Sequence, residues 1–232
     1  MKYDRIAIMQ PTFLPWAGYF NLMQSVSGFI FLDDVQLEKQ SWQTRNRFIV
    51  NKDVHWVSIP VRHANLSQKI NQTVIINETS WKSKLAKSFG QNYCKHPYYS
   101  SAKLVIDFLL ANDESILSKF NINVIAFIAK NIGINTPTHL ASEYNIKTPR
   151  TSKLVDLCKC FSSNEYLSPV GSAGYLAADD FIGHSEAKLI FQNYEPDIYV
   201  QKNSKEFIAS LSIIDVIANL GWDKTAEYIK GK

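Results

Sequence analysis

The sequence predicts an α/β fold, a three-layer and mainly parallel sheet with a β-hairpin insertion and a helical region. Two short apolar runs, residues 6–9 and 29–32, are typical of buried strands, and each ends in polar residues. Between them, residues 18–27 place apolar side chains at spacings of three and four, the pattern of one helical face. This strand–loop–helix–strand order indicates a parallel unit, whose ligands bind at the carboxyl ends of the strands.

The remaining elements follow in order along the chain. Strands are expected at 47–50, 54–61, 74–76, 136–141, 166–167 and 188–191. Helices are expected at about 80–93, 97–110, 115–130, 152–161, 175–182, 210–220 and 222–229. No linker, repeat or low-complexity segment interrupts this order, so we expect a single α/β domain over residues 1–232, with a helical subregion at about 80–130.

Composition and charge favour a cytoplasmic globular protein. Of the 232 residues, 46% are hydrophobic and 20% are charged, which is enough apolar material for a sizeable core. No apolar run approaches the ~20 residues of a membrane helix, and the N-terminus lacks the pattern of a signal peptide. The odd count of three cysteines indicates reduced thiols. The net charge of +4 fits a small acidic ligand such as a nucleotide-sugar, but it is too weak and dispersed to argue for nucleic acid, and no DNA partner is expected.

The loops after the first two strands carry the strongest functional signal. Asp33 and Asp34 can bind an amine, orient a sugar hydroxyl or act as a general base. Arg45 and Lys39 can pair with phosphate oxygens, and Trp16 and Trp42 can stack on a sugar or a nucleobase. The candidate binding residues of these loops are Gln10, Pro11, Trp16, Gln36, Lys39, Trp42, Arg45 and Asn46. The structural alternative places the tryptophans in the core and the arginine on the surface.

Two further segments place polar groups after expected strands. Ser142 and Glu143 follow the strand at 136–141, and Glu143 is a third candidate for the general base. In residues 168–175, two serines and two glycines precede a helix and can present backbone amides to an anion. The alternative is a tight turn, because the segment matches neither a P-loop nor GxGxxG. The candidate binding residues here are Ser142, Ser168, Gly171, Ser172 and Tyr175.

Metal and cysteine chemistry are not expected. The five histidines are scattered and lack the HxH or HExxH spacing of metal sites. Cys158 and Cys160 are two positions apart, so on a helix their side chains point in different directions. We expect both to be small buried hydrophobic residues. The sequence assigns no metal and no cofactor.

Several motifs are shared with a known family. In the opening region they are Gln10-Pro11, Pro15-Trp16, Gly18-Tyr19-Phe20, Asp34-Val35-Gln36 and Ser41-Trp42-Gln43-Thr44-Arg45-Asn46. Later they are Tyr166-Leu167-Ser168, Gly171, Gly174-Tyr175-Leu176, Tyr199, Gln201, Leu211-Ser212 and Asp215. On these residues the chain resembles the WbqC-like family of bacterial proteins over nearly its whole length, and Gln201 joins the candidate binding residues. Members sit in gene clusters for O-antigen and related surface polysaccharides. The resemblance implies the attachment of an acyl group, glycine in some proposals, to an amino sugar carried on a nucleotide.

The opening unit also resembles that of nucleotidylyltransferases and other HIGH-motif (HUP) enzymes, which place phosphates at the first helix. Here the segment Pro15-Trp16-Ala17-Gly18-Tyr19 has no histidine in either HIGH position. The resemblance therefore implies a shared scaffold, while adenylyl transfer by that mechanism is not expected.

Three functions follow from these observations. The first is a transferase that acylates the amine of a nucleotide-linked deoxyamino sugar, with Asp33, Asp34 or Glu143 as general base and Arg45, Asn46 or amides near Gly171 holding the oxyanion. The second is a non-catalytic accessory protein that binds a nucleotide-sugar. The third is a nucleotidyltransferase-like enzyme. The acyl donor stays open among an aminoacyl-tRNA, an acyl thioester and an amino acid activated by ATP, and the sequence assigns no oligomeric state.

Overall fold

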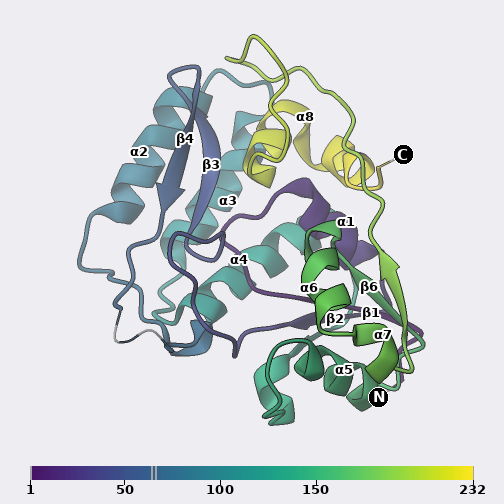
Figure 1. Cartoon of the computed structure of the whole chain (residues 1–232). Helices are drawn as coiled ribbons and strands as arrows, with labels where there is room; N and C mark the ends of the chain where they lie inside the picture. Colours follow the sequence, from purple (N-terminus) through teal and green to yellow (C-terminus); the bar gives the residue numbers. More distant parts are fainter. Residues whose placement is uncertain (1, 64, 66, 232) are drawn as a thin grey trace.

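A five-stranded parallel sheet forms the centre of the protein, whose computed structural model describes residues 2–63, 65 and 67–231 (Figure 1). Its strands are β1 (Arg5–Met9), β2 (Gly28–Phe31), β5 (Thr138–Leu140), β6 (Glu165–Ser168) and β7 (Lys188–Phe191). They lie in the order β5-β2-β1-β6-β7, and every pair is parallel. The order reverses between β1 and β6, as in Rossmann-like sheets, so the predicted α/β class is confirmed.

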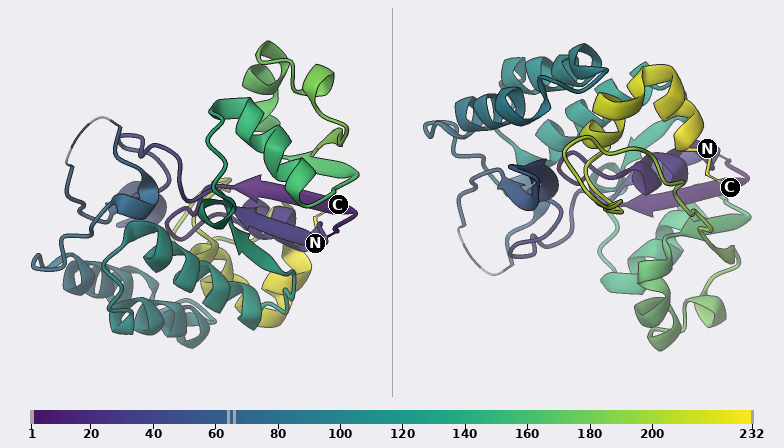
Figure 2. Two further views of the ribbon diagram at one scale, coloured as in Figure 1. Left: turned by 90° about the horizontal axis from the view of Figure 1, so that it is seen from below. Right: turned by 90° about the horizontal axis from the view of Figure 1, so that it is seen from above.

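Helices cover both faces of this sheet, which gives three layers (Figure 2). On one face lie α1 (Ala17–Gln24), α4 (Leu117–Asn131) and α8 (Ile213–Tyr228), and on the other α5 (Arg150–Cys160), α6 (Ala173–Ala178) and α7 (Phe181–His184). Alternate strand residues supply the two cores, because successive side chains of a strand point to opposite faces. Ile6 and Ile8 pack with α5, and Ala7 packs with the first set of helices.

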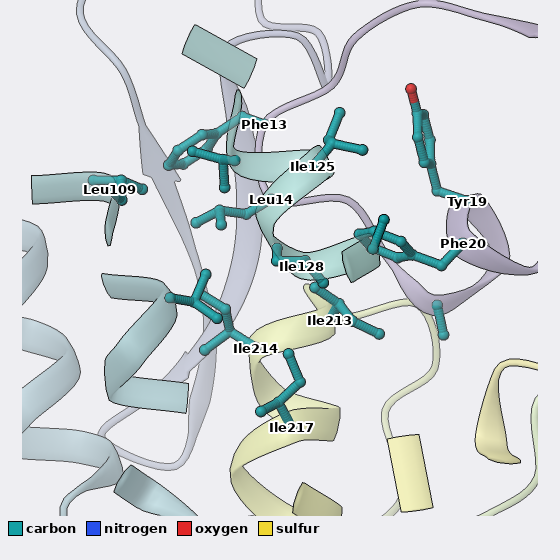
Figure 3. Packing of buried hydrophobic residues seen from close by; sticks show 14 of the residues in the cluster. Phe13, Leu14, Tyr19, Phe20, Leu109, Ile125, Ile128, Ile213, Ile214 and Ile217 are labelled. Carbon is teal, nitrogen blue, oxygen red and sulfur yellow. The ribbon is translucent and has the colours of Figure 1, made fainter. Parts of the chain in front are cut away.

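The larger core surrounds the loop between β1 and α1. Phe13 and Leu14 of this loop are almost fully buried and are packed among α4 and α8 (Figure 3). Ile125 and Ile128 of α4 and Ile214 of α8 belong to the same cluster and have no more than a trace of exposed surface. This packing joins the helices to the first loop of the chain, so the loop is part of the core.

A long insertion separates β2 from β5 and contains the predicted hairpin and helical region. Its elements are β3 (Arg45–Val50), β4 (Asp53–Ser58), η1 (Ile70–Gln72), α2 (Trp81–Tyr93), α3 (Tyr99–Ala111) and α4. Strands β3 and β4 pair with each other alone among the described residues, in an antiparallel ribbon. Two short 3-10 turns, η2 (Ala141–Tyr144) and η3 (Val170–Ser172), follow β5 and β6.

Two segments differ in detail from the sequence prediction, and the tail helices agree with it. The expected strand at 74–76 is wrong, because Val74 and Ile75 make only isolated bridges to different partners. The expected helix at 175–182 is interrupted at Asp180, which has a left-handed φ of 47° and caps α7 by accepting from the Gly183 amide. The two tail helices expected at 210–220 and 222–229 are confirmed, because the helical backbone of α8 is broken at Gly221, where a non-helical φ of 75° favours glycine.

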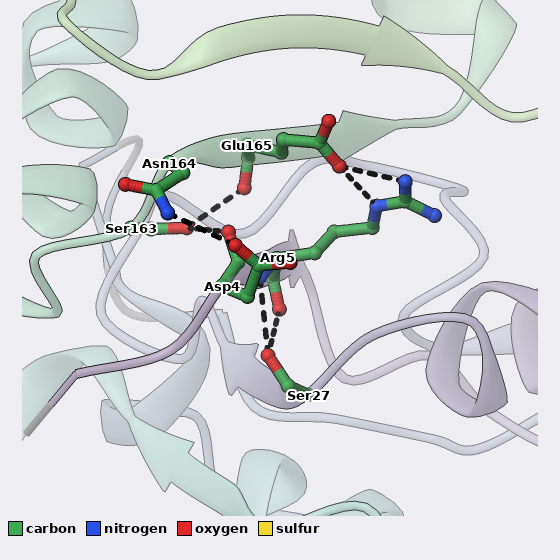
Figure 4. A network of polar contacts seen from close by, with 6 residues as sticks. All are labelled: Asp4, Arg5, Ser27, Ser163, Asn164 and Glu165. Atoms are coloured by element: carbon green, nitrogen blue, oxygen red, sulfur yellow. Dashed lines mark hydrogen bonds and ion pairs between the residues drawn. The ribbon is translucent and has the colours of Figure 1, made fainter.

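The amino-end edge of the sheet is closed by polar contacts between β1 and β6 (Figure 4). Arg5 pairs with Glu165 at 2.6 Å, and the Ser27 hydroxyl donates to the Arg5 carbonyl at 2.8 Å. Asn164 donates to the Asp4 carboxylate at 2.9 Å. These contacts hold the strands in register at the end opposite to the one where parallel sheets bind ligands.

Asp215 of α8 is a buried carboxylate that joins distant parts of the chain. Its Oδ1 accepts from the Tyr93 hydroxyl of α2 at 3.0 Å, and its Oδ2 accepts from the Tyr199 hydroxyl at 2.7 Å. Burial raises the pKa of the Asp215 carboxyl to about 6, and the hydrogen bonds that it accepts only partly offset this effect.

The pH dependence of stability should reveal this carboxyl group. Its native pKa of about 6 lies above the ordinary 3.8, so the folded state holds the proton more tightly than the unfolded state. The protonated Asp215 carboxyl therefore contributes fully to the stability of the folded state below about pH 4. The free energy of unfolding falls by roughly 3 kcal/mol as the pH rises through about 6. Urea denaturation of the wild type and Asp215→Asn should show a difference in unfolding free energy that falls by this amount. A difference independent of pH contradicts the buried titration.

Candidate active site

A cleft of about 650 Å³ opens at the carboxyl-end edge of the sheet. It lies where β1, β2 and β5 end and where α5 begins, and η1 of the insertion forms part of its wall. Parallel α/β sheets bind their ligands at this edge. Its charged lining residues are Asp34, Glu38, Lys69, Lys147, Arg150 and Lys153. Four cations face two carboxylates, so the cleft favours an anionic ligand.

Asp34 and Lys153 form a buried ion pair in the wall of this cleft. Lys153 Nζ lies 2.5 Å from Asp34 Oδ2, and the two side chains are 7% and 11% exposed. Lys153 also donates to the Ile146 carbonyl at 3.3 Å. Asp34 Oδ1 is buried and accepts no hydrogen bond from any described residue. Because an unpaired buried acceptor is costly, this oxygen is suited to receive an N–H or O–H group of a ligand.

Asp33 joins the ends of β2 and β5 beneath the cleft. Its Oδ1 accepts from the Ser142 amide at 3.0 Å, and its Oδ2 accepts from the Ser142 hydroxyl at 2.7 Å. The Asp33 carbonyl accepts from the Asn71 amide at 3.0 Å, which fixes η1 to the same point. Asp33 is only 3% exposed. Both carboxylate oxygens are therefore used to position other lining residues.

Gln10 and Gln36 complete the set of predicted residues that line the cleft. Gln10 Oε1 accepts from Gln43 Nε2 at 2.7 Å, and Gln43 Oε1 accepts from the Glu38 amide at 3.2 Å. Gln36 lies exposed at the rim. The structure thus brings Gln10, Asp34, Gln36 and Ser142 together.

Asn46 and Gln201 lie outside this cleft, and protein backbone occupies their side chains. Asn46 Nδ2 donates to the carbonyls of Phe13 (2.9 Å) and Leu14 (2.7 Å), and its Oδ1 accepts from the Arg47 amide at 2.7 Å. Gln201 exchanges two hydrogen bonds with the backbone of Ile208, at 2.9 Å and 2.7 Å. Both amides hold loops in place.

The loop at 168–175 also lies outside the cleft lining. The hydroxyls of Ser168 and Ser172 are 2.5 Å apart, and Ser172 donates to the Pro169 carbonyl at 2.6 Å. These contacts close the η3 turn. Gly171 and Tyr175 are exposed at the start of α6. The anion-binding role of this loop stays a prediction.

The remaining predicted residues are distributed over other surfaces. Trp16 packs against Tyr194, with ring centroids 5.6 Å apart, and the buried Pro11 accepts from Asn121 Nδ2 at 3.0 Å. Lys39 and Glu143 are exposed and do not line the cleft. Arg45 begins β3 and lies over the Trp56 ring of β4, and Trp42, in the turn just before β3, contacts Trp56 and Arg47.

The cationic part of the cleft was not identified from the sequence. Lys69, Lys147 and Arg150 lie in loops or at a helix start, where lysine and arginine are ordinary surface residues. Lys153 did leave a signal, because it lies four residues before the buried Leu157, on the side of α5 that packs on the sheet. A lysine at such a position needs a buried partner, which is Asp34.

A second hollow of about 560 Å³ lies at the opposite, amino-end edge of the sheet. It is lined by Lys2, Cys158 and Ser163 among others. Burial raises the pKa of the Cys158 thiol to about 12, so this thiol is no nucleophile near neutral pH. Within the described residues, no three His, Cys, Asp or Glu side chains gather in a way that could hold a metal ion. The carboxyl-end cleft is therefore the candidate site.

Sheet order and cleft together define an α/β protein of Rossmann-like topology with a charged ligand site at the carboxyl ends of its strands. The chain belongs to the WbqC-like protein family, whose sequence profile matches residues 10–227. It is similar to Rv1507c, an uncharacterised protein of Mycobacterium tuberculosis, with 26% identity over 231 residues that cover 94% of each chain. No solved structure matches the chain. None of the described helices is long and apolar enough to cross a membrane.

Loss of one partner of the buried ion pair should destabilise the fold. Asp34→Asn leaves Lys153 buried without a carboxylate and should lower the free energy of unfolding by about 3 kcal/mol. The double variant Asp34→Asn, Lys153→Met removes the unpaired charge and should recover most of the loss. Urea denaturation of the single and double variants measures the coupling between the two side chains. A loss below about 1 kcal/mol in Asp34→Asn is typical of an exposed pair and contradicts the buried one.

Proposed function

We propose that the protein is a transferase that attaches an acyl or aminoacyl group, glycyl as the first candidate, to the amine of a nucleotide-linked deoxyamino sugar for surface-polysaccharide synthesis. The observation that carries the proposal is Asp34, a buried carboxylate whose Oδ1 accepts no hydrogen bond from a described residue, in the wall of a cleft lined by four cations and one further carboxylate, Glu38. A ligand with an amine and a diphosphate matches both features. The carboxylate receives the amine, and the cations receive the phosphates.

The start of α5 supports the position of the phosphates. The first amides of a helix lack intrahelical partners, and the residue before α5, Pro149, provides no side-chain cap. Arg150 and Lys147 lie beside this helix start in the cleft lining, and Lys69 lies on the η1 side. Free amides and basic side chains together bind phosphate oxygens.

Asp34 is the best of the three candidates for the general base. Both oxygens of Asp33 accept hydrogen bonds from Ser142, and Glu143 lies outside the cleft lining. The amine nitrogen attacks the acyl carbon, an amide bond forms, and the ester or thioester bond to the leaving group breaks. The proton lost by the nitrogen passes to Asp34 Oδ1 and then to the leaving oxygen or sulfur.

Lys153 and backbone amides are better placed than Asn46 to hold the oxyanion. Both polar atoms of the Asn46 side chain are hydrogen-bonded to backbone groups. The Lys153 ammonium lies beside Asp34 in the cleft and carries the positive charge that a developing oxyanion needs.

Ligand binding is the first test of this proposal. A nucleotide-linked amino sugar at 100 times its dissociation constant should stabilise the wild type by ~2.7 kcal/mol, which is several degrees in a thermal-shift assay. Lys69→Ala and Arg150→Ala should reduce the shift, because each removes a phosphate contact. Lys103→Ala, which removes an equal charge from the exposed surface of α3, is the matched control. A shift with nucleoside triphosphates alone favours a nucleotidyltransferase instead.

Turnover separates a transferase from an accessory protein. Asp34→Asn should lower the rate of amide formation by ~10²–10⁴ when the product is followed by mass spectrometry. Glu143→Gln is the informative comparison, because it removes the rival carboxylate outside the cleft. If Glu143→Gln loses the rate and Asp34→Asn keeps it, the assignment of the base is wrong. Binding of the sugar without turnover by any activated acyl donor identifies an accessory protein.

A further inference from the structure

Two tryptophans stand half-exposed and in contact on the hairpin. Trp42 is 45% exposed and Trp56 is 46% exposed, and their ring centroids are 5.0 Å apart at an interplanar angle of 51°. Large aromatic rings in contact with each other and with water are uncommon on a protein surface that binds nothing.

Each of these rings carries an arginine. The Arg45 guanidinium carbon lies 4.1 Å from the centre of the Trp56 ring, and that of Arg47 lies 5.6 Å from the centre of Trp42. No hydrogen bond or ion pair from a described residue reaches the Arg45 side chain, so its charge is not neutralised. Arg47 is oriented by the carbonyls of Ala209 and Ser210, at 3.1 Å and 2.9 Å. These four residues, Trp42, Arg45, Arg47 and Trp56, are the hairpin platform.

Hydrogen bonds and strand pairing hold the backbone of the platform in place. The Trp42 carbonyl accepts from the buried Phe13 amide at 2.8 Å, and the neighbouring Gln43 carbonyl accepts from Asn121 Nδ2 at 2.8 Å. Trp56 lies in β4, where it pairs with Arg47 of β3. A ligand therefore meets rings whose backbone is already ordered, which lowers the entropic cost of binding.

We propose that the hairpin platform binds the end of a single-stranded RNA, with successive bases stacked on Trp42 and Trp56 and phosphates paired with Arg45 and Arg47. Stacked aromatic rings with interleaved cations bind single strands without regard to sequence. The tilt of 51° between the indoles prevents one flat base from lying on both, so the geometry fits two bases better than one.

The hairpin platform also indicates the acyl donor, an aminoacyl ester of RNA. This inference rests on the proposed function. Gln43 follows Trp42 and hydrogen-bonds Gln10 in the cleft lining, so platform and cleft lie at the two ends of one short connection. An RNA bound by its terminal bases can present an aminoacyl ester on its last ribose to the amine in the cleft. The ester C–O bond breaks as the amide bond forms, and the ribose hydroxyl takes the proton.

Fluorescence anisotropy with a labelled single-stranded RNA of mixed sequence tests the platform directly. Trp56→Ala should weaken binding roughly 5- to 150-fold, the loss of one stacked base. Arg45→Ala should reduce the slope of log K against log salt by about 0.7, the loss of one phosphate contact. Lys103→Ala, on the exposed surface of α3, removes the same charge away from the platform and should leave both quantities unchanged.

Three results overturn the proposal: equal affinity in Trp56→Ala and wild type, binding of coenzyme A at the platform without binding of RNA, and binding of a linear polysaccharide there instead. The thermal shift with a nucleotide-linked amino sugar, measured on the same variants, separates the two sites. RNA binding without that thermal shift supports the hairpin platform as an RNA site and contradicts the proposed nucleotide-sugar acceptor. The thermal shift without RNA binding contradicts the RNA site alone and leaves the proposed acceptor unaffected.

Discussion

The buried loop at residues 11–17 imposes the constraint on which the rest of the structure depends. Backbone groups away from water must find hydrogen-bond partners, and a loop has no ladder to provide them. Asn121 of α4 binds the carbonyl of residue 11, Asn46 of β3 binds those of 13 and 14, and the Ile213 amide of α8 binds that of 15. The hairpin, α4 and α8 are therefore connected to the sheet through one loop, and each supplies hydrogen-bond donors to the carbonyl groups of that loop.

This constraint also decides which helix start is open to a ligand. The start of α1 is covered, because Trp16 forms a bridge with Ser212 and the hollow beside them has a volume of only about 10 Å³. The start of α5 lines the large cleft instead. Of these two helix starts, only that of α5 borders the cleft at the carboxyl-end edge of the sheet, and our proposal therefore places the phosphates there.

The sequence predicted the fold more completely than it predicted the candidate site. Strand and helix periodicity determined nearly every element, and the polar ends of β1, β2 and β5 located the cleft through Gln10, Asp34 and Ser142. Residue type could not separate a polar side chain that binds a ligand from one that satisfies buried backbone, and so Asn46 was predicted as a binding residue. Lys153 was not predicted as a site residue, because its partner Asp34 is distant in the chain and the sequence does not show that the two side chains meet.

The mild net charge of +4 is compatible with the two anion sites that we propose, because positive charges are grouped at both of them. Of 25 lysines and arginines, four line the cleft and two stand on the hairpin platform. In the cleft, low exposure strengthens the ion pair of Asp34 and Lys153, whereas Lys69, Lys147 and Arg150 are exposed and reachable by a ligand. On the platform, the indole faces hold the guanidinium groups of Arg45 and Arg47 without neutralising them. The transfer that we propose joins two anionic substrates, and the cleft and the hairpin platform provide a separate group of positive charges for each of them.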